Sequence, residues 1–227
     1  MLYTEEAARA NVRTRDGKRV FFLGKSDTLT PGARDFLTRE RIEVRPAEEA
    51  KIGEYRLLSG GILREKPEHL THLQGNVLVS KDHPRIAFRG AVDALQAEIL
   101  LCQLEIPAMR RELGEILKLA RRIMRCDVLE EPLQEEKLCG LTQQELRAHS
   151  HRPQDHYGQP HFMPEWEDGP EILRLNRLRC RVRDAERAAV AAFADENGKP
   201  ARVDLLQAMN RMSSMVYILM IRWKKER

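Results

Sequence analysis

The feature that most constrains the fold is an apolar stripe with the period of an α-helix, between Pro170 and the pair Asn197 and Gly198. The stripe consists of Leu175, Leu178, Val182, Ala185 and Ala189. Residues at this spacing lie on one helix face, which must be buried against other elements. Because proline is common at helix starts and glycine just after helix ends, the sequence predicts one long helix from Pro170 to about Asp195.

The same segment carries a charged stripe beside the apolar one. Its members are Arg179, Arg183, Glu186 and Arg187. A charged stripe alone is usual for a solvated helix, because ion pairs one turn apart stabilise exposed helices. The next predicted helix, however, holds Asn210 and Ser214 among methionines and aliphatic residues, where buried polar groups need partners. Two neighbouring helices that both bring polar groups indicate a binding site.

Apolar spacing and boundary residues predict four further helices. They cover about residues 90–105, residues 107–131, a short segment from Thr142 and residues 204–223. Thr142 and Glu145 have the spacing of a capping box, and Asp204 is the expected cap of the last helix. Residues 149–169 are rich in histidine and proline and are predicted to be irregular. Five helices with short connections predict a mainly α fold, a five-helix antiparallel bundle.

The first part of the chain has a different pattern. Residues 19–23 and 42–44 are strand candidates, and a helix is expected between them from Pro31, capped by Thr30. Residues 46–67 are irregular and predict a linker or mobile loop. The predicted domains are a small N-terminal α/β appendage with its linker, residues 1–69, and a helical-bundle domain, residues 70–227.

Composition places the chain among soluble globular proteins. It has 227 residues, of which 33% are charged and 42% hydrophobic. No run of 18 apolar residues is present, and the N-terminus lacks the order of a secretory signal, which predicts a cytoplasmic protein without a membrane partner. The four cysteines form no Cys-x-x-Cys pair, so we expect reduced thiols.

The charge balance permits an anionic ligand. The formal net charge is +4, acidic and basic residues are interspersed, and only 5% of residues are aromatic. A phosphate-bearing small molecule therefore fits at least as well as nucleic acid. His149, His151, His156 and His161 match neither a helical histidine pair nor a zinc finger, so a loop that packs over a ligand is preferred to a metal site.

Four segments together resemble a known family. Residues 81–85, 90–96, 179–187 and 210–213 occur in the order seen in ATP:cob(I)alamin adenosyltransferases of the PduO type. Residues 71–73, 81–90, 150–153 and 210–214 are closer still to the ethanolamine-utilization (EutT) type, and the helix at Pro31 is typical of that branch. The resemblance covers nearly the whole chain.

This resemblance implies a reaction in which cob(I)alamin attacks the 5′ carbon of ATP, giving adenosylcobalamin and triphosphate. The expected ligands are ATP, Mg²⁺ and cobalamin. The protein must hold two large molecules in line and place cations around the leaving triphosphate. Lys81, Arg183 and Arg211 are the cations at matching positions.

The resemblance also implies roles for single residues. Asp93 pairs with Arg179 across a subunit boundary, while Arg183, Glu186 and Asn210 line the nucleotide. The implied oligomer is a homotrimer with sites between subunits. From the residues alone, Asp93 is equally an aspartate favoured near a helix start, and Lys81 a solvated loop residue.

Phe162 matches the side chain that the family pushes under the corrin to displace the lower axial ligand of cobalt. A plain hydrophobic anchor for the histidine-rich loop is the alternative. Thr71 and His72, with Gly75 and Asn76, take the place of the glycine-rich phosphate loop, which residues 13–18 resemble only faintly.

Two departures from the family pattern stand out. Residues 51–68 lack the cysteines and histidine that bind a divalent metal in known EutT proteins, so no metal ligands are assigned. Ser214 replaces the family's aspartate after the Asn-Arg-Leu-Ser motif.

Other functions remain open from sequence. The main alternative is an inactive corrinoid carrier or an assembly protein of an ethanolamine-degrading microcompartment. A nucleic-acid-binding module is a second alternative, with arginines of the charged stripe contacting phosphates. An adenosylcobalamin-dependent lyase is the expected recipient of the product.

Overall fold

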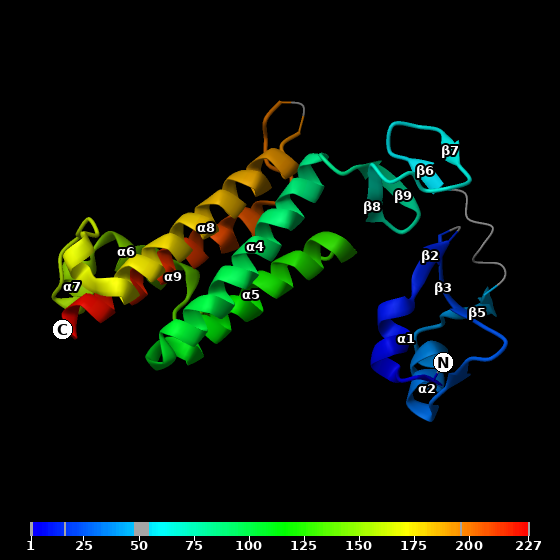
Figure 1. The fold of residues 1–227 in the computed structure, drawn as a ribbon, viewed down its shortest axis with the longest axis horizontal. Helices are drawn as coiled ribbons and strands as arrows, with labels where there is room; N and C mark the ends of the chain where they lie inside the picture. Colours follow the sequence, from blue (N-terminus) through cyan, green and yellow to red (C-terminus); the bar gives the residue numbers. More distant parts are fainter. Residues whose placement is uncertain (1, 16, 48–54, 196, 227) are drawn as a thin grey trace. The chain divides into compact units, whose positions relative to one another are not determined.

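The computed structural model describes residues 2–15, 17–47, 55–195 and 197–226. The chain divides into two compact units, Met1–Lys81 and Asp82–Arg227. The strands lie in the first unit and the long helices in the second (Figure 1). The prediction of a mainly α chain is confirmed.

The N-terminal part of the first unit is a small α/β structure. Its elements are β1 Leu2–Tyr3, α1 Glu5–Asn11, β2 Arg13–Arg15, β3 Lys18–Leu23, β4 Thr28–Leu29, α2 Pro31–Arg39 and β5 Glu43–Pro46. Strands β3 and β5 pair in parallel, as a helical crossover through α2 allows. The Thr30 side chain accepts a hydrogen bond from the Ala33 amide at 3.3 Å, so the predicted cap is confirmed.

A four-stranded sheet occupies residues 55–80. Its strands are β6 Tyr55–Leu57, β7 Ile62–Leu63, β8 Leu70–Gln74 and β9 Val77–Ser80, in the order β7-β6-β9-β8. The prediction of irregular structure at residues 46–67 is therefore wrong for β6 and β7, which are too short to show a two-residue alternation; residues 48–54 lie outside the described ranges. Strands β8 and β9 belong to this sheet, and the first compact unit extends to Lys81.

The second unit is built from long helices around one core. Its elements are α4 Pro84–Glu105, the 3₁₀ turn η1 Pro107–Met109, α5 Arg110–Leu129, α6 Gln143–His151, α7 Pro153–Tyr157, the 3₁₀ turn η2 Trp166–Asp168, α8 Gly169–Phe193 and α9 Val203–Lys225. Helix α8 packs against both α4 and α9. The whole apolar stripe of α8 is buried, as its period predicted. In the described parts of the chain, no helix combines the length and apolar character needed to cross a membrane.

Helix boundaries follow local capping chemistry, with two corrections. The capping box of Thr142 and Glu145 is confirmed. Helix α4 begins at Pro84 rather than near residue 90, because the His83 side chain accepts a hydrogen bond from the Arg85 amide at 3.2 Å. The segment 149–169 is not irregular throughout, since α6 continues to His151 and α7 and η2 follow.

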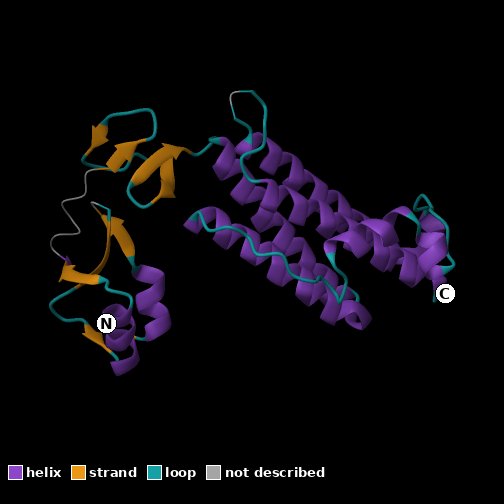
Figure 2. Cartoon of the chain, turned by 180° about the vertical axis from the view of Figure 1, so that it is seen from behind, coloured by secondary structure: helices purple, strands orange, loops and turns teal. Residues whose placement is uncertain are grey.

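Asp204 does not cap α9 through its side chain, contrary to the sequence prediction. The carboxylate instead accepts hydrogen bonds at 2.9 Å from Arg202 and from the Leu133 amide. The bond from Arg202 lowers the pKa of Asp204 to about 2, although partial burial opposes this shift. Asp204 thereby holds the segment 130–142, a loop that lies along α5 in Figure 2. The Gln134 carbonyl of the same loop accepts a hydrogen bond from Arg122 at 2.9 Å.

A buried ion network joins the start of α4 to the end of α5. The Asp127 side chain has no exposed surface and lies 2.8 Å from Arg85 and 2.6 Å from Arg89. Arg85 also pairs at 3.0 Å with Glu130, which is 47% exposed. The network satisfies a carboxylate that would otherwise be buried and unpaired.

Replacing Asp127 by alanine should strongly destabilise the second unit. Arg89 would keep its partly buried charge without a counter-ion and Arg85 would keep only the solvated Glu130, and breaking such a buried pair typically costs about 3 kcal/mol of unfolding free energy. Glu130→Ala is the matched control and should cost less than about 1 kcal/mol, because that pair is largely solvated. Urea unfolding followed by circular dichroism measures both; equal small losses would contradict a structural role for the buried pair.

Candidate functional site

The charged face of α8 meets α9 at two places. Near the middle of both helices, Asn210 donates to the Glu186 carboxylate at 3.0 Å and accepts from Arg211 at 3.1 Å. The Arg179 guanidinium lies 5.2 Å from the ring centre of Tyr217. Arg179 is two turns before Glu186 on α8, and Tyr217 is two turns after Asn210 on α9. This reversed order is that of antiparallel helices, so the contacts belong to one face.

We call this face the polar seam, defined by Arg179, Arg183 and Glu186 of α8 and by Asn210 and Tyr217 of α9. Its apolar backing is complete, because the stripe of α8 and the methionines of α9 at positions 209, 212 and 215 are fully buried. The seam residues therefore stand on a packed core that limits their movement. This confirms that the two helices present neighbouring polar groups.

Arg183 is exposed between the two contacts and has no ion pair or hydrogen bond to any residue that the structure describes. Its neighbour Arg187 lies 3.9 Å from Asp184 instead. Arg183 is thus a solvated cation on the seam, available to an anionic ligand.

Arg211 sits at the border of the seam in an unfavourable electrostatic position. Burial lowers the pKa of its guanidinium, the positive charge of Arg147 lowers it further, and Glu186 opposes the shift. Its Nε atom is buried without a hydrogen-bond partner. An anion here would satisfy a donor and relieve the repulsion from Arg147.

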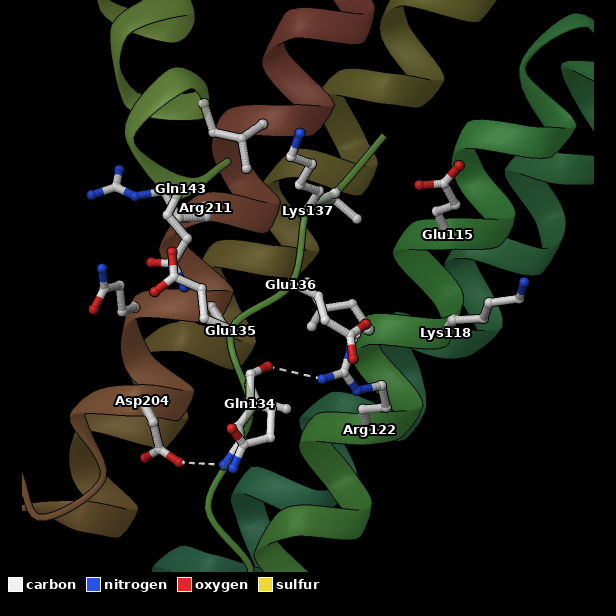
Figure 3. Close-up of a pocket in the computed structure, with 16 residues that line it drawn as sticks. Glu115, Lys118, Arg122, Gln134, Glu135, Glu136, Lys137, Gln143, Asp204 and Arg211 are labelled. Carbon is white, nitrogen blue, oxygen red and sulfur yellow. Dashed lines mark hydrogen bonds and ion pairs between the residues drawn. The ribbon is translucent and has the colours of Figure 1, made fainter. Parts of the chain in front are cut away.

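Arg211 also borders a cavity of about 290 Å³ between α5, α9 and the segment 130–142. Figure 3 shows Arg211 of α9 and Arg122 of α5 on opposite sides of that segment. The lining contains both signs of charge, including Lys118, Glu135 and Asp204. None of the other sequence-assigned site residues lines this cavity.

The histidine-rich loop reaches the seam at Tyr217. The Tyr217 hydroxyl lies 3.0 Å from Nδ1 of His161 and 3.4 Å from the backbone nitrogen of Phe162. Phe162 is half-buried, and Lys224 lies 4.2 Å from its ring centre while also pairing with Asp168 at 2.6 Å. Phe162 is thereby brought close to the α9 end of the seam.

Sequence reasoning missed Tyr217. The available signal was a tyrosine inside the methionine-rich stretch of the last helix, because a tyrosine hydroxyl in an apolar setting usually needs a hydrogen-bond partner. Its partners come from residues 55 and 56 positions earlier in the chain, which no local pattern reveals.

Two other histidines of this region, His149 and His156, contact each other. The rings of His149 and His156 stack with centres 3.8 Å apart, and Nδ1 of His149 lies 2.8 Å from the Tyr157 hydroxyl. Burial lowers the pKa of His149, and His156 adds to the shift. No group of three or more potential metal ligands occurs among the residues with described positions.

Asp93 lies on the exposed side of α4 and accepts a hydrogen bond from Gln96 at 3.3 Å. Within the described parts of one chain, Asp93 and Arg179 form no ion pair with each other. Leu100 and Leu104 follow Asp93 at helical spacing on the same side of α4 and are 48% and 70% exposed. Exposed leucines in line with a carboxylate indicate a surface that another protein could cover.

Thr71, His72 and Lys81 belong to the first unit. Thr71 and His72 lie on β8, and His72 donates from Nδ1 to the Gly75 carbonyl at 3.0 Å. Gly75 adopts a positive φ of 54°, which suits the tight β8–β9 turn. Lys81 follows β9 and is exposed.

Comparison with known proteins places this chain in a family. The family described as cobalamin adenosyltransferase matches residues 62–223. Proteins named corrinoid adenosyltransferase EutT from Salmonella typhimurium strain LT2 and Escherichia coli strain K12 are each 31% identical over 242 residues, covering 96% of this chain and 90% of theirs. The chain therefore belongs to the cobalamin adenosyltransferase family.

Proposed function

We propose that the protein transfers the 5′-deoxyadenosyl group of ATP to cob(I)alamin, giving adenosylcobalamin and triphosphate. The observation that carries this proposal is the polar seam. There Arg183, which has no partner among the described residues, and the unsatisfied Nε of Arg211 lie near Glu186 and Asn210. The names of the EutT relatives support the same activity.

In this reaction the electron pair of Co(I) forms the bond to C5′, the C5′–O bond breaks, and the triphosphate leaves with that bond's electron pair. The nucleophile belongs to the corrinoid substrate, so the protein supplies position and charge. Arg183 and Arg211 stabilise the developing phosphate charge, Lys81 contacts the terminal phosphates, and Glu186 with Asn210 orients the nucleoside. Thr71 and His72 contribute to nucleotide binding from the β8–β9 hairpin.

Mg²⁺ is proposed to enter with the triphosphate. This ion usually keeps several waters and is held largely by substrate phosphates, so it needs few protein ligands. No protein ligand for it is assigned.

We propose that α4, α5, α6, α8 and α9 are the five helices of the family's antiparallel bundle, within an adenosyltransferase domain of residues 70–227. The active assembly is a homotrimer in which Asp93 of one subunit pairs with Arg179 of the next. Support comes from Leu100 and Leu104, which are exposed on the same side of α4 as Asp93 and which a neighbouring subunit would cover.

Phe162 is proposed to lie under the corrin and displace the lower axial ligand before Co(II) is reduced. Its half-buried ring, close to Tyr217 and Lys224, supports a position at the end of the seam. The enzyme is proposed to be cytoplasmic, associated with an ethanolamine-utilization microcompartment, and to supply an adenosylcobalamin-dependent lyase.

The activity is tested by mixing the protein with ATP, Mg²⁺ and chemically reduced cob(I)alamin without oxygen. Light-sensitive adenosylcobalamin should form, and Arg183→Ala should lower kcat/KM by about 100-fold because a cation at the leaving group is lost. Arg187→Ala, one turn along the same helix, is the control and should stay within about twofold. Absence of product from the unaltered protein would leave the corrinoid-carrier alternative.

The intersubunit pair is tested by complementation. Asp93→Ala and Arg179→Ala should each be nearly inactive alone, whereas mixed and reassembled subunits should regain activity, because some sites then combine both native residues. Mixing Arg179→Ala with Arg183→Ala should restore nothing, since both residues come from one α8. Failure of the first mixture despite exchange of subunits, measured by native mass spectrometry, would place Asp93 outside the shared site.

Phe162→Ala should affect the adenosylation rate differently for cob(I)alamin and for cob(II)alamin. The variant should adenosylate pre-formed cob(I)alamin at close to the normal rate but lose most activity from cob(II)alamin with a mild reductant. Met163→Ala, at a neighbouring residue that is 81% exposed, serves as the control. An unchanged rate from cob(II)alamin in Phe162→Ala would leave Phe162 as a loop anchor only.

A further inference from the structure

Tyr217 contacts both groups that the proposed reaction requires to be in place. Its ring lies against the Arg179 guanidinium, 5.2 Å from the centroid, and stacks with His161 at 5.7 Å. Its hydroxyl lies within 3.0 Å of His161 and 3.4 Å of the Phe162 nitrogen. The Tyr217 side chain therefore contacts Arg179, which is proposed to act at the nucleotide, and the loop of Phe162, which is proposed to act at the corrin.

The hydrogen bonds around Tyr217 have a defined direction. A backbone carbonyl only accepts, so the His161 Nε2 that lies 3.1 Å from the His151 carbonyl carries a proton. In a neutral ring Nδ1 is then an acceptor, and the Tyr217 hydroxyl donates to it. The hydroxyl oxygen in turn accepts the Phe162 N–H. Hydrogen bonds thus connect Phe162 through Tyr217 and His161 to the His151 carbonyl of α6, and each donor in this network has an acceptor.

Tyr217, the anchor of this network, lies on the well-packed helix α9, whereas Phe162 lies in a loop outside any regular element. Residues 158–165 between α7 and η2 have no regular secondary structure. The residues flanking Tyr217 on α9, Val216 and Ile218, are buried in the core. The loop around Phe162 is therefore held largely through side-chain bonds to α9, by the Tyr217 hydroxyl and by Lys224, which pairs with Asp168.

We propose that Tyr217 is a positioning residue that holds both Phe162 and Arg179 at fixed places relative to α9. The hydroxyl fixes the Phe162 loop, and the ring fixes Arg179 through a cation–π contact. The two functions are separable, because phenylalanine retains the ring and lacks the hydroxyl. This inference rests on the proposed adenosyltransferase function.

The test compares Tyr217→Phe and Tyr217→Leu in the full-length protein. Three quantities are measured: the rate from pre-formed cob(I)alamin, the KM for ATP, and the rate from cob(II)alamin with a mild reductant. Tyr157→Phe is the matched control, since it removes another tyrosine–histidine hydrogen bond, to His149. Activity of the unaltered protein with cob(I)alamin is established first, so that failure of the overall function is recognised separately.

Tyr217→Phe should lower the cob(II)alamin rate about fivefold to tenfold more than it lowers the cob(I)alamin rate, as expected for loss of one hydrogen bond on the corrin side. Bound cob(II)alamin should also show a smaller fraction without its lower axial ligand in absorption and electron paramagnetic resonance spectra. Tyr217→Leu should in addition raise the KM for ATP about threefold or more, because Arg179 loses the aromatic face.

Three outcomes would overturn the proposal. Tyr217→Phe could slow both cobalt states equally, which indicates a general structural role; it could change neither; or Tyr157→Phe could reproduce its effect. Should Tyr217→Leu fail to fold, the spectrum of cob(II)alamin bound to Tyr217→Phe still decides, because a purely structural tyrosine would not alter the axial ligation of cobalt.

Discussion

The packing of α8 between α4 and α9 is the constraint on which the rest of the helical unit depends. Its buried stripe ends in Ala185 and Ala189, whose small side chains allow neighbouring helices to approach closely. Arg177 and Arg174 strengthen the α4 side by pairing with the buried Glu98 at 3.0 Å and with Glu105 at 2.7 Å. Once this face is buried, Arg179, Arg183 and Glu186 lie along its flank, where Arg179 and Glu186 contact α9.

The seam therefore combines a rigid base with unsatisfied charge. The methionine-rich core beneath α9 holds Asn210 and Tyr217 in place. Among the described residues, Arg183 and the Nε of Arg211 have no hydrogen-bond partner. This is the arrangement expected of a site that stabilises a polyanion, because donors that are fixed before the ligand arrives need little reorganisation. Leaving the buried Nε of Arg211 unpaired lowers the stability of the free protein and favours the bound state.

The chain departs from the pattern of its family at positions that the structure helps to interpret. Residues 51–68 contain neither cysteine nor histidine, and their described part contributes β6 and β7 to a four-stranded sheet. Ser214, which replaces an aspartate, is half-buried one turn from Asn210. The acidic group nearest to Asn210 is instead Glu186, to which it donates.

The sequence by itself determined the features that depend on neighbours along the chain. The apolar period of α8, the Thr30 and Thr142 caps and the β3–α2–β5 order followed from local spacing, and the order of short motifs identified the family. Only the tertiary structure decided the partners of Asp127, Asp204 and Tyr217 and the strands β6 and β7. Each of these depends on residues far away in sequence, and burial fixes a polar group's partner only after the helices and strands have packed.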